Sequence, residues 1–102
     1  MDTVEFLSCT EIRMGSPFRT CSIRLHLDWE PDMPTSGFQN LSAQSPDARY
    51  LALVRWHTPD NQPGFVVYTL DTVARTVAVS QPQAGCCERL WWDGGFRWSA
   101  AA

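Results

Sequence analysis

The chain contains no lysine, so all eight of its basic residues are arginines. Eleven acidic residues are interspersed with them, which leaves a net charge of −3 and a pI of about 5.1. Nucleic-acid-binding proteins usually combine a basic stripe with a basic pI, so we expect no nucleic-acid partner. The codon bias of a GC-rich genome explains the missing lysines more simply than recognition of phosphate or carboxylate by guanidinium groups.

Long apolar runs are also missing. No run approaches the roughly 20 apolar residues that a transmembrane helix requires. Two acids, Asp2 and Glu5, precede any apolar stretch, which is unlike a secretory signal. Hydrophobic residues make up 44% of the 102 residues, which is too many for a disordered tail and enough for one core. We therefore predict a single domain over residues 1–102, located in the cytoplasm and without membrane contact.

Cysteine and histidine are scarce. Four cysteines are too few for a disulfide scaffold, and Cys86 and Cys87 are adjacent, whereas paired zinc ligands are usually two to four residues apart. The two histidines, His26 and His57, are not in metal-ligand spacing with any cysteine. We therefore expect no metal ion or other cofactor, and we expect all four cysteines to be buried thiols.

No segment has the apolar spacing of an amphipathic helix. The apolar runs are four to eight residues long, β-branched or aromatic, and bounded by proline and glycine, which is typical of strands. A short helical turn at 81–87 is the one alternative. The sequence therefore predicts an all-β fold with very little helix, a twisted antiparallel sheet of six or seven strands. The candidate strand segments are 3–14, 18–29, 38–44, 50–57, 65–70, 76–80, 88–92 and 96–99.

The first two strands predict an N-terminal hairpin over 3–29 that turns at Gly15-Ser16-Pro17. Paired residue numbers then sum to about 30, so that Cys9 faces Cys21, Leu7 faces Ile23 and Glu11 faces Arg19. A Cα separation beyond about 7 Å between Cys9 and Cys21 would reject this register. The two thiols are close enough to oxidise, but a reduced pair is the default in the cytoplasm.

The second block, 38–99, contains two similar turn segments. Asp47 and Asp93 lie 46 residues apart, each in a turn that precedes an arginine and aromatic residues, and this spacing is close to that of propeller blades. The Ser45-Pro46-Asp47 turn and the segment 67–72 resemble a blade of the TolB-type propellers. That family has glycine where this chain has Ala48 and Val73. The resemblance implies one blade-like antiparallel meander, since a closed propeller needs about four to eight blades.

The segment 11–17, together with the Ser-Pro-Asp turn, is also similar to small bacterial proteins of the polymorphic-toxin immunity kind. Such proteins act by occluding a partner, so the resemblance implies a protein-binding module without catalytic residues. An alternative is a small enzyme or ligand-binding domain, which would use His57, Asp60 and either Cys86 or Cys87. A third possibility is a structural blade that completes its sheet by self-association. We expect a binding protein rather than an enzyme.

Tryptophan is abundant, with five in the chain and three of them between residues 91 and 98. Neighbouring residues of a strand point to opposite faces, so either the last hairpin is buried on both sides or one tryptophan points outward. Tryptophan and arginine are enriched at binding hot spots. We therefore predict that this hairpin lies at the sheet edge and contacts another protein or a second copy, although rings that fill the core are the competing interpretation. The candidate residues are Arg89, Trp91, Trp92, Arg97 and Trp98.

Overall fold

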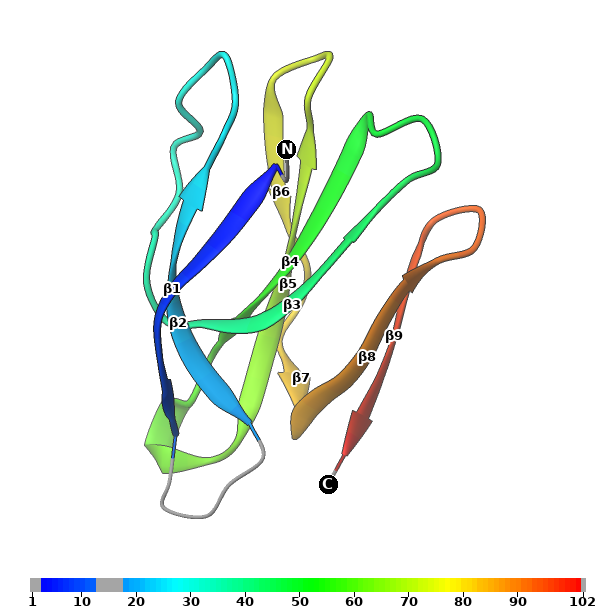
Figure 1. Cartoon of the computed structure of the whole chain (residues 1–102). Helices are drawn as coiled ribbons and strands as arrows, with labels where there is room; N and C mark the ends of the chain where they lie inside the picture. The colour runs from blue at the N-terminus through cyan, green and yellow to red at the C-terminus, as the bar shows by residue number, and fades with distance from the viewer. Residues whose placement is uncertain (1–2, 13–17, 102) are drawn as a thin grey trace.

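The computed structural model describes residues 3–12 and 18–101 and shows an all-β fold (Figure 1). Strands hold 60% of the described residues and helix 3%, which confirms the predicted fold class. The predicted turn at 15–17 lies outside the described residues. The elements are β1 (Val4–Glu11), β2 (Arg19–Leu25), β3 (Phe38–Gln44), β4 (Tyr50–Trp56), the 3-10 turn η1 (Pro59–Asn61), β5 (Gly64–Asp71), β6 (Thr76–Val79), β7 (Gln83–Ala84), β8 (Cys86–Trp92) and β9 (Phe96–Ala101).

The strands form one large antiparallel sheet and one small one. The order in the large sheet is β1-β2-β3-β4-β5-β6, with β7 also pairing with β5, while β8 and β9 pair with each other in a separate sheet. The prediction that the last hairpin lies at the edge of the sheet is therefore wrong. The helical turn weighed at 81–87 is not formed either, because β7 and the start of β8 occupy that segment. Gly85, in the left-handed region at φ 90°, redirects the chain between those two strands.

The central strand β4 is buried on both faces, as its two-sided apolar sequence predicts. Leu51 and Leu53 point to one face, where the ribbon β1–β2 and the following loop cover them. Ala52 and Val54 point to the other face, which the hairpin β8–β9 covers. The domain therefore has three layers, with the hairpin β8–β9 to the right of β3, β4 and β5 in Figure 1 and the ribbon β1–β2 to their left.

A bulge in β1 changes the register of the ribbon β1–β2. Glu11 pairs with Arg19 as predicted, but Leu7 pairs with Ser22 rather than with Ile23. The cause is Ser8, whose φ of 52° is left-handed. Ser8 and Cys9 together face the single residue Cys21, and such an insertion shifts every later pair by one.

The same bulge leaves Cys9 beside Cys21. Their Cα atoms are 4.2 Å apart and the two residues form a disulfide bond. The spacing predicted for this pair is confirmed, while the expectation that both cysteines stay reduced is corrected. The bond holds together a ribbon that pairs with the rest of the sheet at one position, Cys21 with Phe38.

The Ser-Pro-Asp turn before β4 is built on side-chain hydrogen bonds. The Ser45 hydroxyl donates to Asp47 Oδ1 at 2.6 Å and accepts the backbone N–H of Tyr50 at 3.0 Å. Asp47 also accepts the backbone N–H of Arg49. Ala48 is left-handed at φ 62°, a region of backbone conformation that favours glycine. The turn is thus formed by local bonds even though alanine is strained there.

Asp71 joins the end of β5 to the start of β4. Its carboxylate accepts two bonds from the Arg49 guanidinium, each 3.0 Å long, and the backbone N–H groups of Val73 and Ala74. The bonds from Arg49, followed by that from the Ala74 N–H, lower the pKa of Asp71 from 3.8 to about 2.

This low pKa predicts an acid dependence of stability. Because the folded pKa lies below the ordinary value, Asp71 stabilises the fold above about pH 4, and this contribution is lost as the pH falls toward 2. Asp71→Asn is therefore expected to be less stable than wild type at pH 7 and to lose less stability between pH 4 and pH 2. Urea unfolding at several pH values measures both effects. Arg49→Met should also reduce the change in the free energy of unfolding between pH 4 and pH 2. If both variants show the same pH dependence as wild type, the assignment to Asp71 is wrong.

Candidate functional site

The buried side chain of Gln39 holds the C-terminal hairpin onto the large sheet. Its Nε2 donates to the Cys87 carbonyl at 2.9 Å, and its Oε1 accepts the Cys87 N–H at 3.1 Å. Gln39 is 2% exposed and Cys87 is 1% exposed. The amide thus pairs with both backbone groups of Cys87, as a neighbouring strand would do. This clasp, the pair of hydrogen bonds between Gln39 and Cys87, fixes which face of β8 meets the sheet, and no local sequence pattern predicts it.

The inner face of the hairpin is apolar and packs on the large sheet. Leu90, Phe96 and Trp98 contact the cluster that contains Val54. Trp92 stacks on Tyr50, with ring centroids 5.9 Å apart and planes 11° apart. Two of the three predicted tryptophans, Trp92 and Trp98, therefore face the interior.

The outer face presents the third tryptophan between two arginines. Trp91 pairs with Arg97 across the hairpin, and the Arg89 guanidinium carbon lies 5.2 Å from the Trp91 ring centroid. Because side chains alternate along a strand, these three residues lie on the face opposite Leu90 and Trp92. Among the described residues, neither arginine has a carboxylate within ion-pair distance. We call Arg89, Trp91 and Arg97 the Arg–Trp–Arg face.

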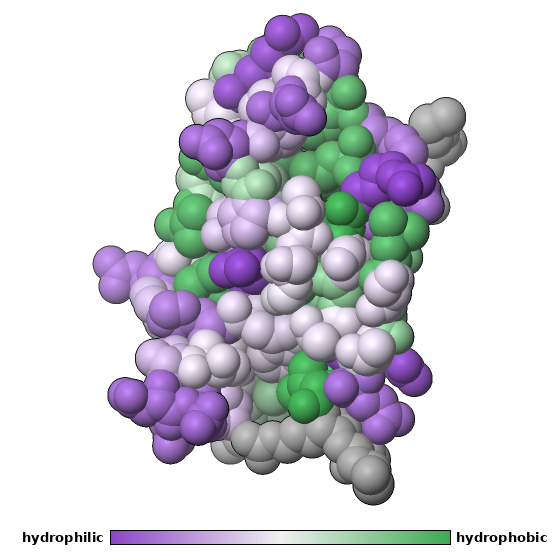
Figure 2. Space-filling model, turned by 90° about the vertical axis from the view of Figure 1, so that its left-hand side faces the viewer, coloured by the Kyte–Doolittle hydropathy of each residue, from purple (hydrophilic) through white to green (hydrophobic). Residues whose placement is uncertain are grey.

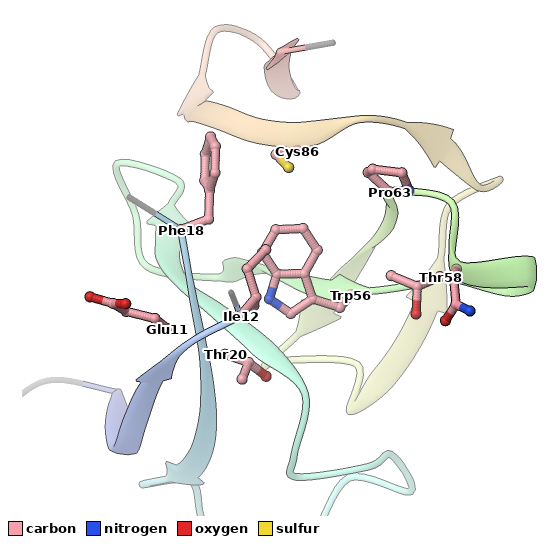
Figure 3. A pocket seen from close by; sticks show the side chains of 9 residues that line it. Glu11, Ile12, Phe18, Thr20, Trp56, Thr58, Pro63 and Cys86 are labelled. Atoms are coloured by element: carbon pink, nitrogen blue, oxygen red, sulfur yellow. The ribbon is translucent and has the colours of Figure 1, made fainter. Parts of the chain in front are cut away.

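A cavity of about 510 Å³ lies between the ribbon β1–β2, the end of β4 and the start of β8 (Figure 3). Trp56 lies at the centre of the view in Figure 3. Two contacts hold its side chain: Nε1 donates to the Arg19 carbonyl at 2.9 Å, and the ring packs edge-on against Phe18 with the ring centroids 6.3 Å apart. The described lining residues are Glu11, Ile12, Phe18, Thr20, Trp56, Thr58, Asn61, Pro63 and Cys86.

The residues of the alternative enzyme prediction are not brought together in this cavity. Cys86 lines it, but the described lining residues do not include His57 or Asp60, which are both exposed. Cys87 is buried, and this burial raises the pKa of its thiol to about 11. A thiol with such a pKa is protonated near pH 7 and is a poor nucleophile.

The opposite side of the molecule is formed by the ribbon β1–β2 and the loop that follows it. In Figure 2, hydrophilic residues gather at both ends of this face, and hydrophobic residues lie in separate groups. The ion pair of Arg24 with Glu5 lies on this ribbon, and His26, which directly follows β2, bonds to the same Glu5. Its charges are therefore partly paired, in contrast to those of the Arg–Trp–Arg face.

Three further observations concern ligands and relatives. In residues 3–12 and 18–101, no three His, Cys, Asp or Glu side chains are grouped as a metal ion would require. The same residues contain no helix with the length and apolar character to cross a bilayer. No known protein family, curated protein or solved structure matches the chain.

Proposed function

We propose that the chain is a protein-binding module that contacts its partner through the Arg–Trp–Arg face. The supporting observation is the placement of Trp91 on the outer face, against Arg89 and opposite Arg97, while the other rings of the hairpin pack inward. Tryptophan supplies a large contact area, and arginine supplies charge-assisted hydrogen bonds to carboxylates. The proposed partner surface therefore carries carboxylates.

The hairpin is well suited to binding by occlusion. Its inner face is anchored by Gln39 and Trp98, so the outer residues need little ordering when a partner docks, and less entropy is lost. An inhibitor of the immunity kind acts in this way, by covering a functional surface of its target. A bacterial origin and the cytoplasm as location belong to this proposal.

A photo-crosslinking amino acid at position 91 tests the proposal in cells. We expect it to capture one defined partner, while the same group at Val73, which is 70% exposed on another turn, captures none. With that partner purified, Trp91→Ala is expected to weaken binding by about 30-fold, the effect of a hot-spot residue. Its melting temperature should remain close to that of wild type.

Trp98→Ala is the matched control, because Trp98 belongs to the same hairpin but packs on the core. It is expected to lower the melting temperature. If Trp91→Ala unfolds the protein as Trp98→Ala does, or if positions 73 and 91 capture the same proteins, the proposed face is wrong.

A further inference from the structure

The outer edge of β9 is available for pairing. Among the described strands, β9 pairs with β8 alone, and the hairpin that these two strands form lies on the right of the molecule in Figure 1. The Asp93 N–H donates to the Gly95 carbonyl at 2.8 Å, so Trp92 and Phe96 are a non-hydrogen-bonded pair. Ladder bonds alternate in antiparallel strands. The backbone N–H and C=O groups of Phe96, Trp98 and Ala100 therefore point away from β8.

The other strand edges carry features that discourage pairing. The first strand, β1, has the bulge at Ser8, and Pro82 interrupts the edge between β6 and β7. The far side of β8 is engaged by the Gln39 amide. Bulges, prolines and covered backbone are the usual protections of an edge. In contrast, β9 has no proline, and the bulge of this hairpin lies on β8, between Cys87 and Arg89, rather than on β9.

A hollow of about 450 Å³ lies at the carboxyl end of β9, and its described lining is Gln62, Pro63, Ala84, Gly85, Ala100 and Ala101. Ala100 shares the inner face of β9 with Trp98, whereas Arg97 belongs to the outer face. A strand added beside β9 would place alternate side chains on these two faces. One set would approach the Arg97 guanidinium, and an apolar side chain of the other set would enter the hollow beside Ala100.

We propose that the partner contributes an extended segment that pairs with β9 as an additional strand, with acidic residues on the outer face and apolar residues on the inner face. This inference rests on the proposed function and names the mode and chemistry of the contact. Arg97 and Arg89 favour an acidic segment over a second copy of this chain, because a second β9 would place like charges on one face.

An acetylated and amidated peptide of alternating glutamate and valine, nine residues long, is the probe. Added to the full-length ¹⁵N-labelled protein, it is expected to slow hydrogen exchange at the N–H groups of Trp98 and Ala100. A peptide with N-methyl groups on alternate amides keeps the side chains but cannot pair, and lysine in place of glutamate reverses the charge. Each change should weaken binding by about tenfold or more. Equal binding of the N-methylated peptide would overturn the added strand.

Two protein variants test the same contact. Ala100→Pro removes an outward N–H from an edge position and is expected to abolish peptide binding, while Ala100→Ser keeps the N–H and should bind as wild type does. Arg97→Glu should prefer the lysine peptide, and an unchanged preference for glutamate would overturn the acidic partner. A dimer in sedimentation with the same protected amides would make a second copy the occupant instead.

The outcomes separate this inference from the proposed function. Perturbation of the Arg89 and Trp91 signals without protection of Trp98 and Ala100 overturns the added strand and leaves the Arg–Trp–Arg face in place. Protection of the β9 edge, combined with a Trp91→Ala variant that binds the partner normally, overturns the face and supports the edge.

Discussion

Replacement of Gln39 by leucine is expected to lower the free energy of unfolding by about 2–6 kcal/mol. Leucine has a similar volume but cannot bond, so the N–H and the carbonyl of Cys87 both lose their partner in a buried position. Each buried backbone group left without a partner costs about 1–3 kcal/mol. A small domain has about 5–15 kcal/mol in total, so the loss is a large share of its stability.

Urea unfolding measures this loss, and a thiol reagent reports its location. If the hairpin is released from the sheet, Cys87 becomes reactive before global unfolding. Gln44→Leu is the matched control, since its exposed amide donates to Thr3 Oγ1, and it should change stability by less than about 0.5 kcal/mol. Equal stability of the two leucine variants would show that the clasp contributes little.

Removal of the Cys9–Cys21 disulfide is expected to cost about 3 kcal/mol. The bond closes a loop with a sequence separation of 12, and the chain-entropy model gives about 3 kcal/mol for a loop of that length. The ribbon β1–β2 depends on it, because β2 pairs with β3 at one position. Reductant should lower the free energy of unfolding of wild type by about this amount, which is measured as a lower urea midpoint.

The double variant Cys9→Ala/Cys21→Ala provides the control for that measurement. It should start at the lower midpoint and show no response to reductant. A wild-type midpoint that reductant leaves unchanged would mean that the ribbon does not depend on the bond. The variant also shows whether Cys86 and Cys87 respond to the reductant, since both remain as thiols.

The redox state of this pair in intact cells tests the proposed location. Alkylation before reduction counts the thiols, with two expected where the disulfide persists and four where it is reduced. Disulfides persist in oxidising compartments and are rare in the cytoplasm. A count of four supports the cytoplasm, and a count of two contradicts it.

Features of the sequence that act over a few residues predicted most of the strands. Predicted strand 38–44 coincides with β3, and predicted strand 50–57 exceeds β4 by one residue, because proline or glycine lies near both ends of each and β4 is rich in apolar residues. The burial of β4 on both faces also follows from its sequence. The opposite orientation of Trp91 and Trp92 follows from the period of a strand. These features can be predicted without information about which strands are neighbours in the fold.

The fold class, most strand positions and the residue types of the last hairpin thus follow from the order of amino acids alone. The place of that hairpin, the choice of its outward face and the register of β1 with β2 depend on long-range packing. Gln39 and Cys87 are 48 residues apart in the chain, and no local rule pairs an amide in one strand with the backbone of another. The bulge at Ser8 likewise shifts a register that hairpin symmetry alone sets differently. Both depend on which apolar faces must be buried together, and only the assembled core settles that.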